Sequence, residues 1–157
     1  MKKIIVLLAF SNIAFTQNIK STKDVEKVLD KLHLYAAEAN AKKYIDLFAD
    51  DAVFFGTDIS ERWPKVEFSK YATDRMSSGT GWTYFMKERN LYFSNDDKTA
   101  WFDEILTNKS YGEFRGTGVL KMVGSQWKIV QYNLLLPIPN NLMKKYAFEI
   151  KAFYGQK

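Results

Sequence analysis

Residues 110–139 read SYGEFRGTGVLKMVGSQWKIVQYNLLLPIP and predict two long β-strands. The first strand is expected over Tyr111–Val123 and the second over Gln126–Leu136, with Gly124 and Ser125 between them. A two-residue connection that contains glycine is typical of a hairpin, because glycine adopts the positive φ angle that a tight reversal needs. The two strands are therefore expected to pair in an antiparallel sheet.

The first of these strands carries three glycines on one face. Because side chains alternate along a strand, Gly112, Gly116 and Gly118 share a face. Phe114 lies on the same face. Each glycine weakens a strand, so three of them on one face indicate sharp bending or the close approach of another element. The pattern predicts a strongly bent sheet with helices in its hollow.

The rest of the chain places helices before most of the strands. Apolar residues at three- and four-residue steps predict the helices, and alternation predicts the strands. This order is typical of an α+β fold, in which helices pack in the hollow of a strongly bent, mostly antiparallel sheet. The expected elements are a helix over 21–39, a short helix after Asn40, a short strand over 52–55, a helix over 64–79, strands over 82–94 and 99–108, and a closing helix from Asn140.

Length and composition narrow the function. The 157 residues suit one domain, and the formal charge is +5. The basic residues are scattered rather than gathered in a stripe, which argues against nucleic-acid binding. The absence of cysteine excludes disulfides, thiol catalysis and thiolate metal sites, and a single histidine makes a zinc site unfavourable. We therefore expect no metal and no cofactor.

The first residues have the pattern of a secretory signal peptide. Lys2 and Lys3 precede the short apolar run Ile4–Phe10, which is too short for a resident membrane helix. Cleavage is expected near Thr16 and Gln17, which leaves one domain over residues 17–157 and no stable membrane anchor. Removal of residues 1–16 takes away two lysines and no acid, so the formal charge falls from +5 to +3. The protein is expected to be exported, either to a periplasm or out of the cell.

Three segments carry a resemblance to a known family. They are YIDLFADDAVFFGTD (44–58), RGTGVLKM (115–122) and WKIVQYNLLLPIPN (127–140). With the order of elements, they resemble the SnoaL-like branch of the nuclear transport factor 2-like superfamily. The resemblance implies a cone of helices inside a bent sheet, a cystatin-like arrangement, with a pocket in the hollow. It does not imply one function, because this superfamily contains isomerases, cyclases, dehydratases, ligand binders and assembly domains.

Ketosteroid isomerases share this fold, and the resemblance allows their catalytic positions to be compared with this chain. Their aspartate base corresponds here to Gly56, which cannot take a proton. Their oxyanion-hole tyrosine corresponds to a position near Leu32, and their oxyanion-hole acid to a position near Gly118. The resemblance therefore implies a pocket and argues against that particular reaction.

The predicted pocket is aromatic, with Asp103 as its candidate catalytic carboxylate. Burial beside Trp101 would raise the pKa of Asp103 and make it usable as a base or acid. The alternative is a strand carboxylate that forms an ion pair with Arg115, Lys87 or Arg89. The predicted lining consists of Trp63, Trp101, Asp103, Phe114, Gly116, Gly118 and Tyr132.

Three further residues are secondary candidates. His33 is the only histidine and lies one step from the apolar face of the first predicted helix. Asp58 belongs to the loop Thr57–Trp63, where it either forms part of a cavity rim with Glu61 or bonds local backbone in a turn. Arg115 lies on the strand face opposite the glycines.

These observations favour an exported domain that binds a small, largely apolar molecule in an aromatic-lined cavity. One alternative is a proton-transfer enzyme, an isomerase, dehydratase or hydrolase, with Asp103 as base and Tyr132 as donor. Another is an assembly or interaction domain. A homodimer is expected through the outer face of the sheet, which would include Arg115, Thr117 and Val119.

Overall fold

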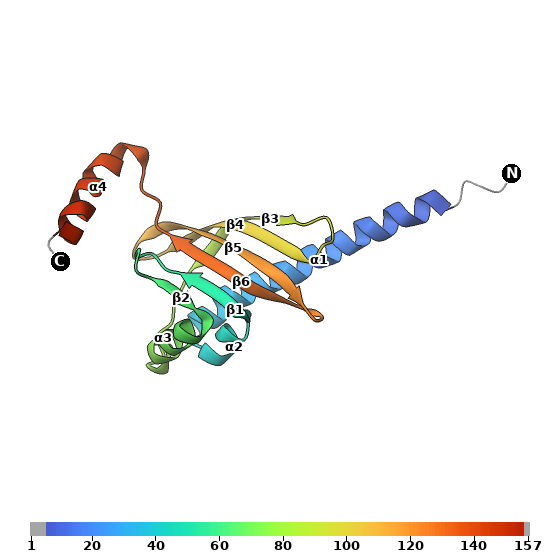
Figure 1. Cartoon of the computed structure of the whole chain (residues 1–157), viewed down its shortest axis with the longest axis horizontal. Helices are drawn as coiled ribbons and strands as arrows, with labels where there is room; N and C mark the ends of the chain where they lie inside the picture. The colour runs from blue at the N-terminus through green and yellow to red at the C-terminus, as the bar shows by residue number, and fades with distance from the viewer. Residues whose placement is uncertain (1–5, 156–157) are drawn as a thin grey trace.

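The structure is a computed structural model that describes residues 6–155, with side chains from residue 21 onward (Figure 1). The predicted α+β fold is confirmed: helices α1 to α3 lie against one side of a curved sheet that does not close into a barrel. The helices are α1 (Val6–Ala37), α2 (Ala41–Ile45), α3 (Lys65–Ser77) and α4 (Asn140–Gly155), and the strands are β1 (Phe48–Phe55), β2 (Arg62–Pro64), β3 (Phe85–Phe93), β4 (Thr99–Asn108), β5 (Gly112–Val123) and β6 (Gln126–Leu135).

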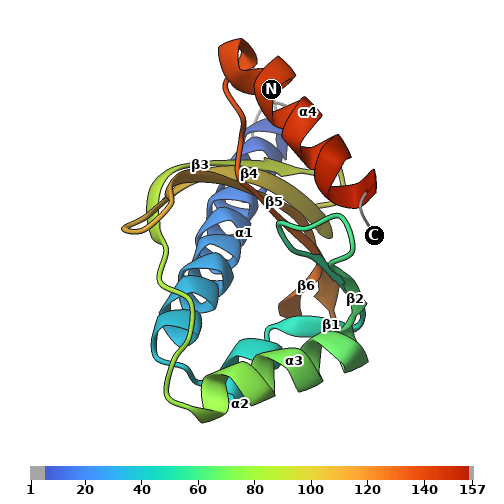
Figure 2. The same ribbon diagram turned by 90° about the vertical axis from the view of Figure 1, so that its left-hand side faces the viewer.

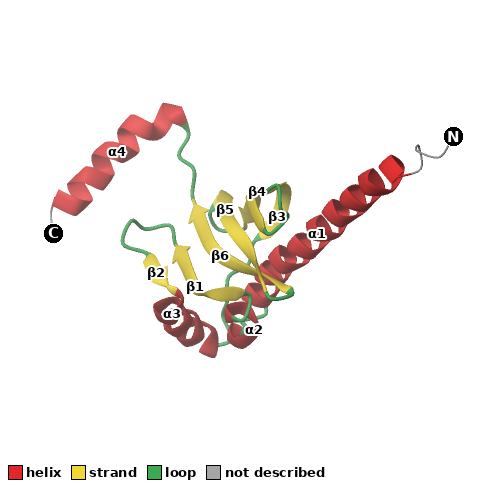
Figure 3. Ribbon diagram, turned by 45° about the vertical axis from the view of Figure 1, so that its right-hand side comes forward, coloured by secondary structure: helices red, strands yellow, loops and turns green. Residues whose placement is uncertain are grey.

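The six strands form one sheet in the order β2-β1-β6-β5-β4-β3 (Figures 2 and 3). The pairs β1–β2, β3–β4, β4–β5 and β5–β6 are antiparallel, whereas β1 and β6 are parallel. The predicted β5–β6 hairpin is confirmed, and Gly124 at its turn has a φ of 60°. The sheet is therefore mostly antiparallel, as expected, and its last strand lies in its middle.

Several predicted boundaries differ from the observed ones. Strand β1 begins at Phe48 rather than at Ala52, because its first residues pair with β6 ahead of a register shift. Pro64 ends β2 and serves as the N-cap of α3, so the helix begins one residue later than predicted. Strand β3 begins at Phe85, and the residues before it follow an extended path without regular pairing.

The hydrophobic core lies between α1 and the inner face of the sheet. On α1, Val25, Leu29 and Leu32 are almost completely buried, which agrees with the predicted apolar face. Opposite them lie inward side chains of the sheet, including Leu106 and Leu120. Burial of one leucine side chain stabilises a fold by roughly 1.5–3 kcal/mol. This part of α1 is thus fixed against the sheet by packing, which also sets the position of the adjacent His33.

Gly118 allows two elements of the sheet to approach closely. A Cβ atom on Gly118 would lie 2.3 Å from the backbone oxygen of Gln131 and 2.7 Å from the ring of Phe102. The glycine face of β5 does point inward, as predicted. The prediction that Gly118 lines the pocket is wrong, however, because protein atoms already occupy the space beside it.

Helix α4 lies apart from the rest of the fold (Figures 1 and 2). None of its residues is buried, and apolar side chains such as Tyr146, Ile150 and Phe153 are exposed. The hydroxyl of Tyr154 donates a hydrogen bond of 3.3 Å to Asp58 in the β1–β2 loop. The core is therefore formed without α4.

The predicted signal peptide stays a prediction. Its first residues lie outside residues 6–155, and the expected cleavage site lies in the part of α1 whose side chains are not described. Among the described residues, no helix combines the length and the apolar character needed to cross a membrane.

Candidate functional site

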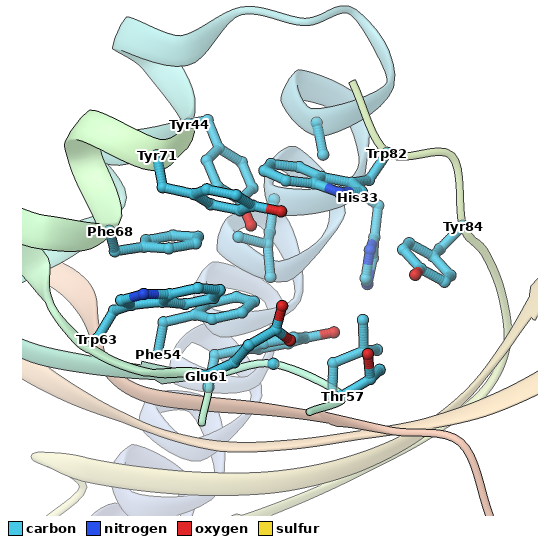
Figure 4. Close-up of a pocket in the computed structure, with 15 residues that line it drawn as sticks. His33, Tyr44, Phe54, Thr57, Glu61, Trp63, Phe68, Tyr71, Trp82 and Tyr84 are labelled. Atoms are coloured by element: carbon cyan, nitrogen blue, oxygen red, sulfur yellow. The ribbon is translucent and has the colours of Figure 1, made fainter. Parts of the chain in front are cut away.

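A cavity of about 130 Å³ opens between α1, α3 and the end of the sheet formed by β1 and β6. Its buried wall is formed by side chains such as Leu32, Tyr44 and Tyr132, and its rim includes the exposed Thr57 and Tyr71 (Figure 4). Most of the lining is aromatic, although the side chains come from six different elements and two loops. The hollow of the sheet thus contains a true cavity on one side of the hydrophobic core.

Several of the aromatic rings of this cavity stack on one another, whereas Tyr44 is tilted against its neighbours. Phe54 stacks on Phe68 with ring centroids 4.0 Å apart and an interplanar angle of 9°. Trp63 stacks on Tyr71 at 4.7 Å and 21°, and Phe54 stacks on Tyr132 at 5.6 Å and 23°. Stacked rings present flat apolar surfaces. The shape of the cavity therefore favours a flat occupant.

A buried carboxylate lies directly behind this aromatic wall. Glu104 on β4 is 1% exposed and is hydrogen-bonded on both oxygens. His33 Nε2 is 2.9 Å from Oε1, the Tyr132 hydroxyl donates to Oε1 at 3.2 Å, and Arg89 Nε donates to Oε2 at 3.0 Å. Arg89 Nη1 also donates to Asp30 on α1 at 2.7 Å. The network joins α1, β3, β4 and β6 through charged and polar groups.

Glu104 is held in its ionised form by its neighbours. Burial alone would raise the pKa of the carboxyl, because a low-dielectric interior disfavours the charge. The hydrogen bond from His33, the charge that His33 carries when protonated and the charge of Arg89 together outweigh burial and bring the pKa of Glu104 below its usual value. Glu104 is therefore a carboxylate at neutral pH and acts only as an acceptor.

The ionised carboxylate determines which nitrogen of His33 carries a proton. Since a carboxylate only accepts hydrogen bonds, Nε2 must be the donor in the contact with Glu104. In the neutral ring the lone pair then lies on Nδ1. His33 is one of the residues that line the cavity. Burial raises the pKa of the Tyr132 phenol, so its hydroxyl keeps its proton and donates a hydrogen bond to Glu104.

Gly116 makes room for this network. A Cβ atom at position 116 would lie 2.8 Å from both Glu104 Oε1 and the Tyr132 hydroxyl. Gly116 is also the residue that pairs with Glu104 across β4 and β5. Gly116 was predicted to line the pocket, but the space beside it is occupied by the carboxylate that orients His33.

The β1–β2 loop contributes a second carboxylate at the rim. Glu61 lines the cavity, and its Oε2 accepts a hydrogen bond of 3.1 Å from the backbone nitrogen of Asp58. Asp58 itself does not line the cavity; its Oδ1 accepts a hydrogen bond of 2.8 Å from the backbone nitrogen of Ser60. Of the two interpretations of Asp58, the turn that bonds local backbone is the one observed.

Of the other residues predicted for the site, three line the cavity and several do not. Trp63, Tyr132 and the secondary candidate His33 are among the lining residues. Phe114, Gly116 and Gly118 face inward but lie outside the cavity wall, and Phe114 packs its ring 5.2 Å from that of Tyr84. Arg115 is exposed on the outer face of β5, opposite the inward glycines.

The placement of Trp101 and Asp103 in the cavity is wrong. Trp101 is 45% exposed, and Asp103 pairs with Thr117, a residue of the outer face. The Asp103 carboxylate accepts a hydrogen bond of 3.1 Å from Asn90 on that outer surface. Because successive strand residues point to opposite faces, the error is one position: the inward carboxylate is Glu104.

One feature of the sequence indicates that Glu104 points inward. On β4, the inward positions are Ala100, Phe102, Glu104 and Leu106, so a glutamate interrupts an otherwise apolar alternation. A charged residue in a buried register indicates a paired or functional group. The aromatic lining carried no comparable signal, because these rings come together only through tertiary packing; it includes Phe54, Phe68, Tyr71, Trp82 and Tyr84.

The described residues contain no group of three histidine or acidic side chains placed to hold a metal ion. The side chains at the cavity offer three kinds of polar group. These are an imidazole backed by a carboxylate, several phenolic hydroxyls, and the rim carboxylate of Glu61.

Solved structures with a similar fold include proteins of different names. A candidate scytalone dehydratase from Novosphingobium aromaticivorans aligns with a TM-score of 0.67 and 11% identity, over 79% of this chain and 89% of that protein. A candidate aromatic ring hydroxylase from the same genus and species aligns with a TM-score of 0.64 and 13% identity, over 77% and 92%. A candidate calcium/calmodulin-dependent protein kinase II association domain from Xanthomonas campestris aligns with a TM-score of 0.57 and 21% identity, over 74% and 86%.

The similarity to these structures concerns the fold, since the identities are low. No curated protein matches the chain significantly in sequence. Residues 25–139 match a family model described as a SnoaL-like domain. This range contains the part of α1 from Val25 onward and every strand of the sheet. The chain therefore belongs to the family of SnoaL-like domains.

Proposed function

We propose that this protein binds a small, flat, largely apolar molecule in the cavity described above. The observation that supports the proposal most directly is the set of stacked rings that line the cavity, which includes Phe54, Trp63 and Tyr71. A concave, mostly apolar site with a few polar groups is the usual form of a small-molecule site. One protein of similar fold is named as a candidate aromatic ring hydroxylase, and that name agrees with a flat, apolar ligand.

The volume of the cavity limits the size of its ligand. At about 130 Å³ it is comparable to an engineered apolar cavity of about 150 Å³ that holds benzene. A single six-membered ring with one or two substituents matches this volume. The proposed ligand class is thus a one-ring compound.

Toluene and nitrobenzene are expected to bind with a dissociation constant on the order of 0.1–1 mM, as their few atoms allow. Binding can be followed by tryptophan fluorescence, because Trp63 and Trp82 line the cavity. Replacing Ala36, a lining residue, with Met should weaken binding at least about tenfold by filling the volume. The matched control is Ala41→Met on α2, outside the cavity. Equal binding by the two variants would contradict the proposal.

We further propose that the protein forms a homodimer through the outer face of its sheet. Tyr92 and Trp101 are about half exposed there and stack on each other at 6.0 Å and 12°. Val119, the residue paired with Trp101, lies on the same face. An exposed aromatic pair beside an apolar residue is typical of interface positions. One protein of similar fold is named as a candidate association domain, which agrees with a role in assembly.

Val119→Glu is expected to weaken the dimer by at least about tenfold, because a carboxylate would be buried without a partner. Sedimentation velocity at micromolar concentration measures the change directly. The control is Lys109→Glu, which alters a charge in the β4–β5 turn rather than on the sheet face. A wild-type protein that sediments only as a monomer would rule out the proposed interface.

A further inference from the structure

His33 lines the cavity, and only one of its two ring nitrogens has a hydrogen bond to a described residue. Its Nε2 atom is hydrogen-bonded to Glu104, and no hydrogen bond to Nδ1 is found among the described residues. The ring is held from behind by a carboxylate that is fixed on both oxygens, so its orientation and tautomer are set before a ligand enters. An imidazole in this state is ready to take a proton from a bound molecule.

We propose that the ligand carries an acidic hydroxyl group on its ring, as a phenol does, and that His33 Nδ1 takes the proton of that hydroxyl. The inference rests on the proposed binding function and specifies the chemical class of the ligand. In this step the O–H bond of the phenol breaks and an Nδ1–H bond forms. The electron pair stays on oxygen, so the products are a phenolate and an imidazolium, and no other reactant is needed.

The charges around His33 favour this transfer. Asp30 and Glu104 carry one negative charge each and Arg89 carries one positive charge, so the network has a net charge of −1 while His33 is neutral. Protonation of His33 brings the net charge of this network to zero. Because Glu104 is almost fully buried, its attraction for the imidazolium is weakly screened by water.

Other groups that face the cavity define its selectivity. The phenols of Tyr44, Tyr84 and Tyr132 come from α2, the loop before β3, and β6. Burial raises the pKa of each phenol, so they remain neutral hydrogen-bonding groups. The carboxylate of Glu61 stands at the rim. The negative charge of Glu61 repels another carboxylate at the entrance of the cavity. A phenol with a neutral ring substituent is therefore preferred over a phenol that carries a carboxylate.

4-Nitrophenol is a suitable probe, because it is a one-ring phenol that absorbs visible light only as the phenolate. Bound to the full chain, it should ionise at a pH lower by about one unit or more than the free probe. His33→Gln keeps an amide donor for Glu104 but removes the acceptor at Nδ1, so this lowering should be lost. Asp103→Asn, on the outer face, is the matched control and should keep it.

The single histidine allows a second measurement that needs no variant. In a proton NMR spectrum, the ring resonances of His33 should move to their protonated positions when 4-nitrophenol binds and should not do so with nitrobenzene. If nitrobenzene binds but 4-nitrophenol titrates as in free solution, the proton-transfer proposal is overturned while the binding function stands. Equal shifts in wild type and His33→Gln overturn it as well. If neither compound binds, the binding function itself fails.

Discussion

Gly118→Leu is expected to destabilise the protein by about 4 kcal/mol or more, one of the largest effects of any single substitution in the chain. The reason is geometric: even the Cβ atom would lie 2.3 Å from the backbone oxygen of Gln131, and the rest of the side chain would meet the ring of Phe102. Backbone in the centre of a sheet cannot move aside without breaking the β5–β6 pairing. Chemical denaturation followed by circular dichroism measures the loss.

Thr117→Leu is the matched control for this substitution. Thr117 precedes Gly118 on β5 but faces the outer surface, so its side chain can grow without entering the core. Its effect on the free energy of unfolding should stay within about 0.5 kcal/mol. A Gly118→Leu protein with a nearly unchanged melting temperature would mean that the inner face at this position is open, contrary to the structure.

Glu104→Ala is expected to cost about 3–5 kcal/mol, because it leaves the buried Arg89 guanidinium without its main partner. One guanidinium nitrogen, Nη2, already lacks a hydrogen bond among the described residues, so the remaining atoms have few alternatives. Glu104→Gln keeps an acceptor oxygen and should cost less, about 1–3 kcal/mol. Asp103→Ala, one residue earlier on the outer face, should change the stability little. Similar losses at positions 103 and 104 would contradict the assigned strand faces.

The charge of Glu104 also predicts that the stability of the fold depends on pH. The pKa of Glu104 is lower in the folded protein than its ordinary value of 4.5, so its ionised form stabilises the fold. This contribution is complete above about pH 4.5 and is lost as the pH falls through the folded pKa. The stability difference between wild type and Glu104→Gln should therefore shrink on acidification below pH 4.5. A difference that stays constant down to the acid transition would show that the Glu104 charge contributes nothing.

The sequence was sufficient for the fold because its main signals are local. The β5–β6 hairpin depends on a glycine turn between two alternating runs, and the buried face of α1 follows from spacing within the helix. Local rules of this kind act over a few residues and can be applied without knowledge of tertiary contacts. The family resemblance then connected these elements into one bent sheet.

The site was less predictable because it depends on contacts between distant segments. Whether a strand carboxylate points inward depends on register, and a shift of one residue exchanges Asp103 for Glu104. His33 becomes a site residue only because Glu104 lies 71 positions further along the chain and yet 2.9 Å from its ring. The glycines of β5 were correctly expected to face inward, but their role is to admit protein atoms.

The position of β6 also constrains the order in which the chain can fold. This strand is the last of the six in sequence, yet it lies between β1 and β5. Apart from the short β2, it is the only strand partner of β1 in the described sheet, so β1 cannot join β3, β4 and β5 until β6 is in place. The β3–β4–β5 meander can form from neighbouring residues, whereas the β1–β6 pairing must close a long loop, which is slow. The aromatic cavity, which contains Phe54 of β1 and Tyr132 of β6, is therefore among the last parts of the molecule to be completed.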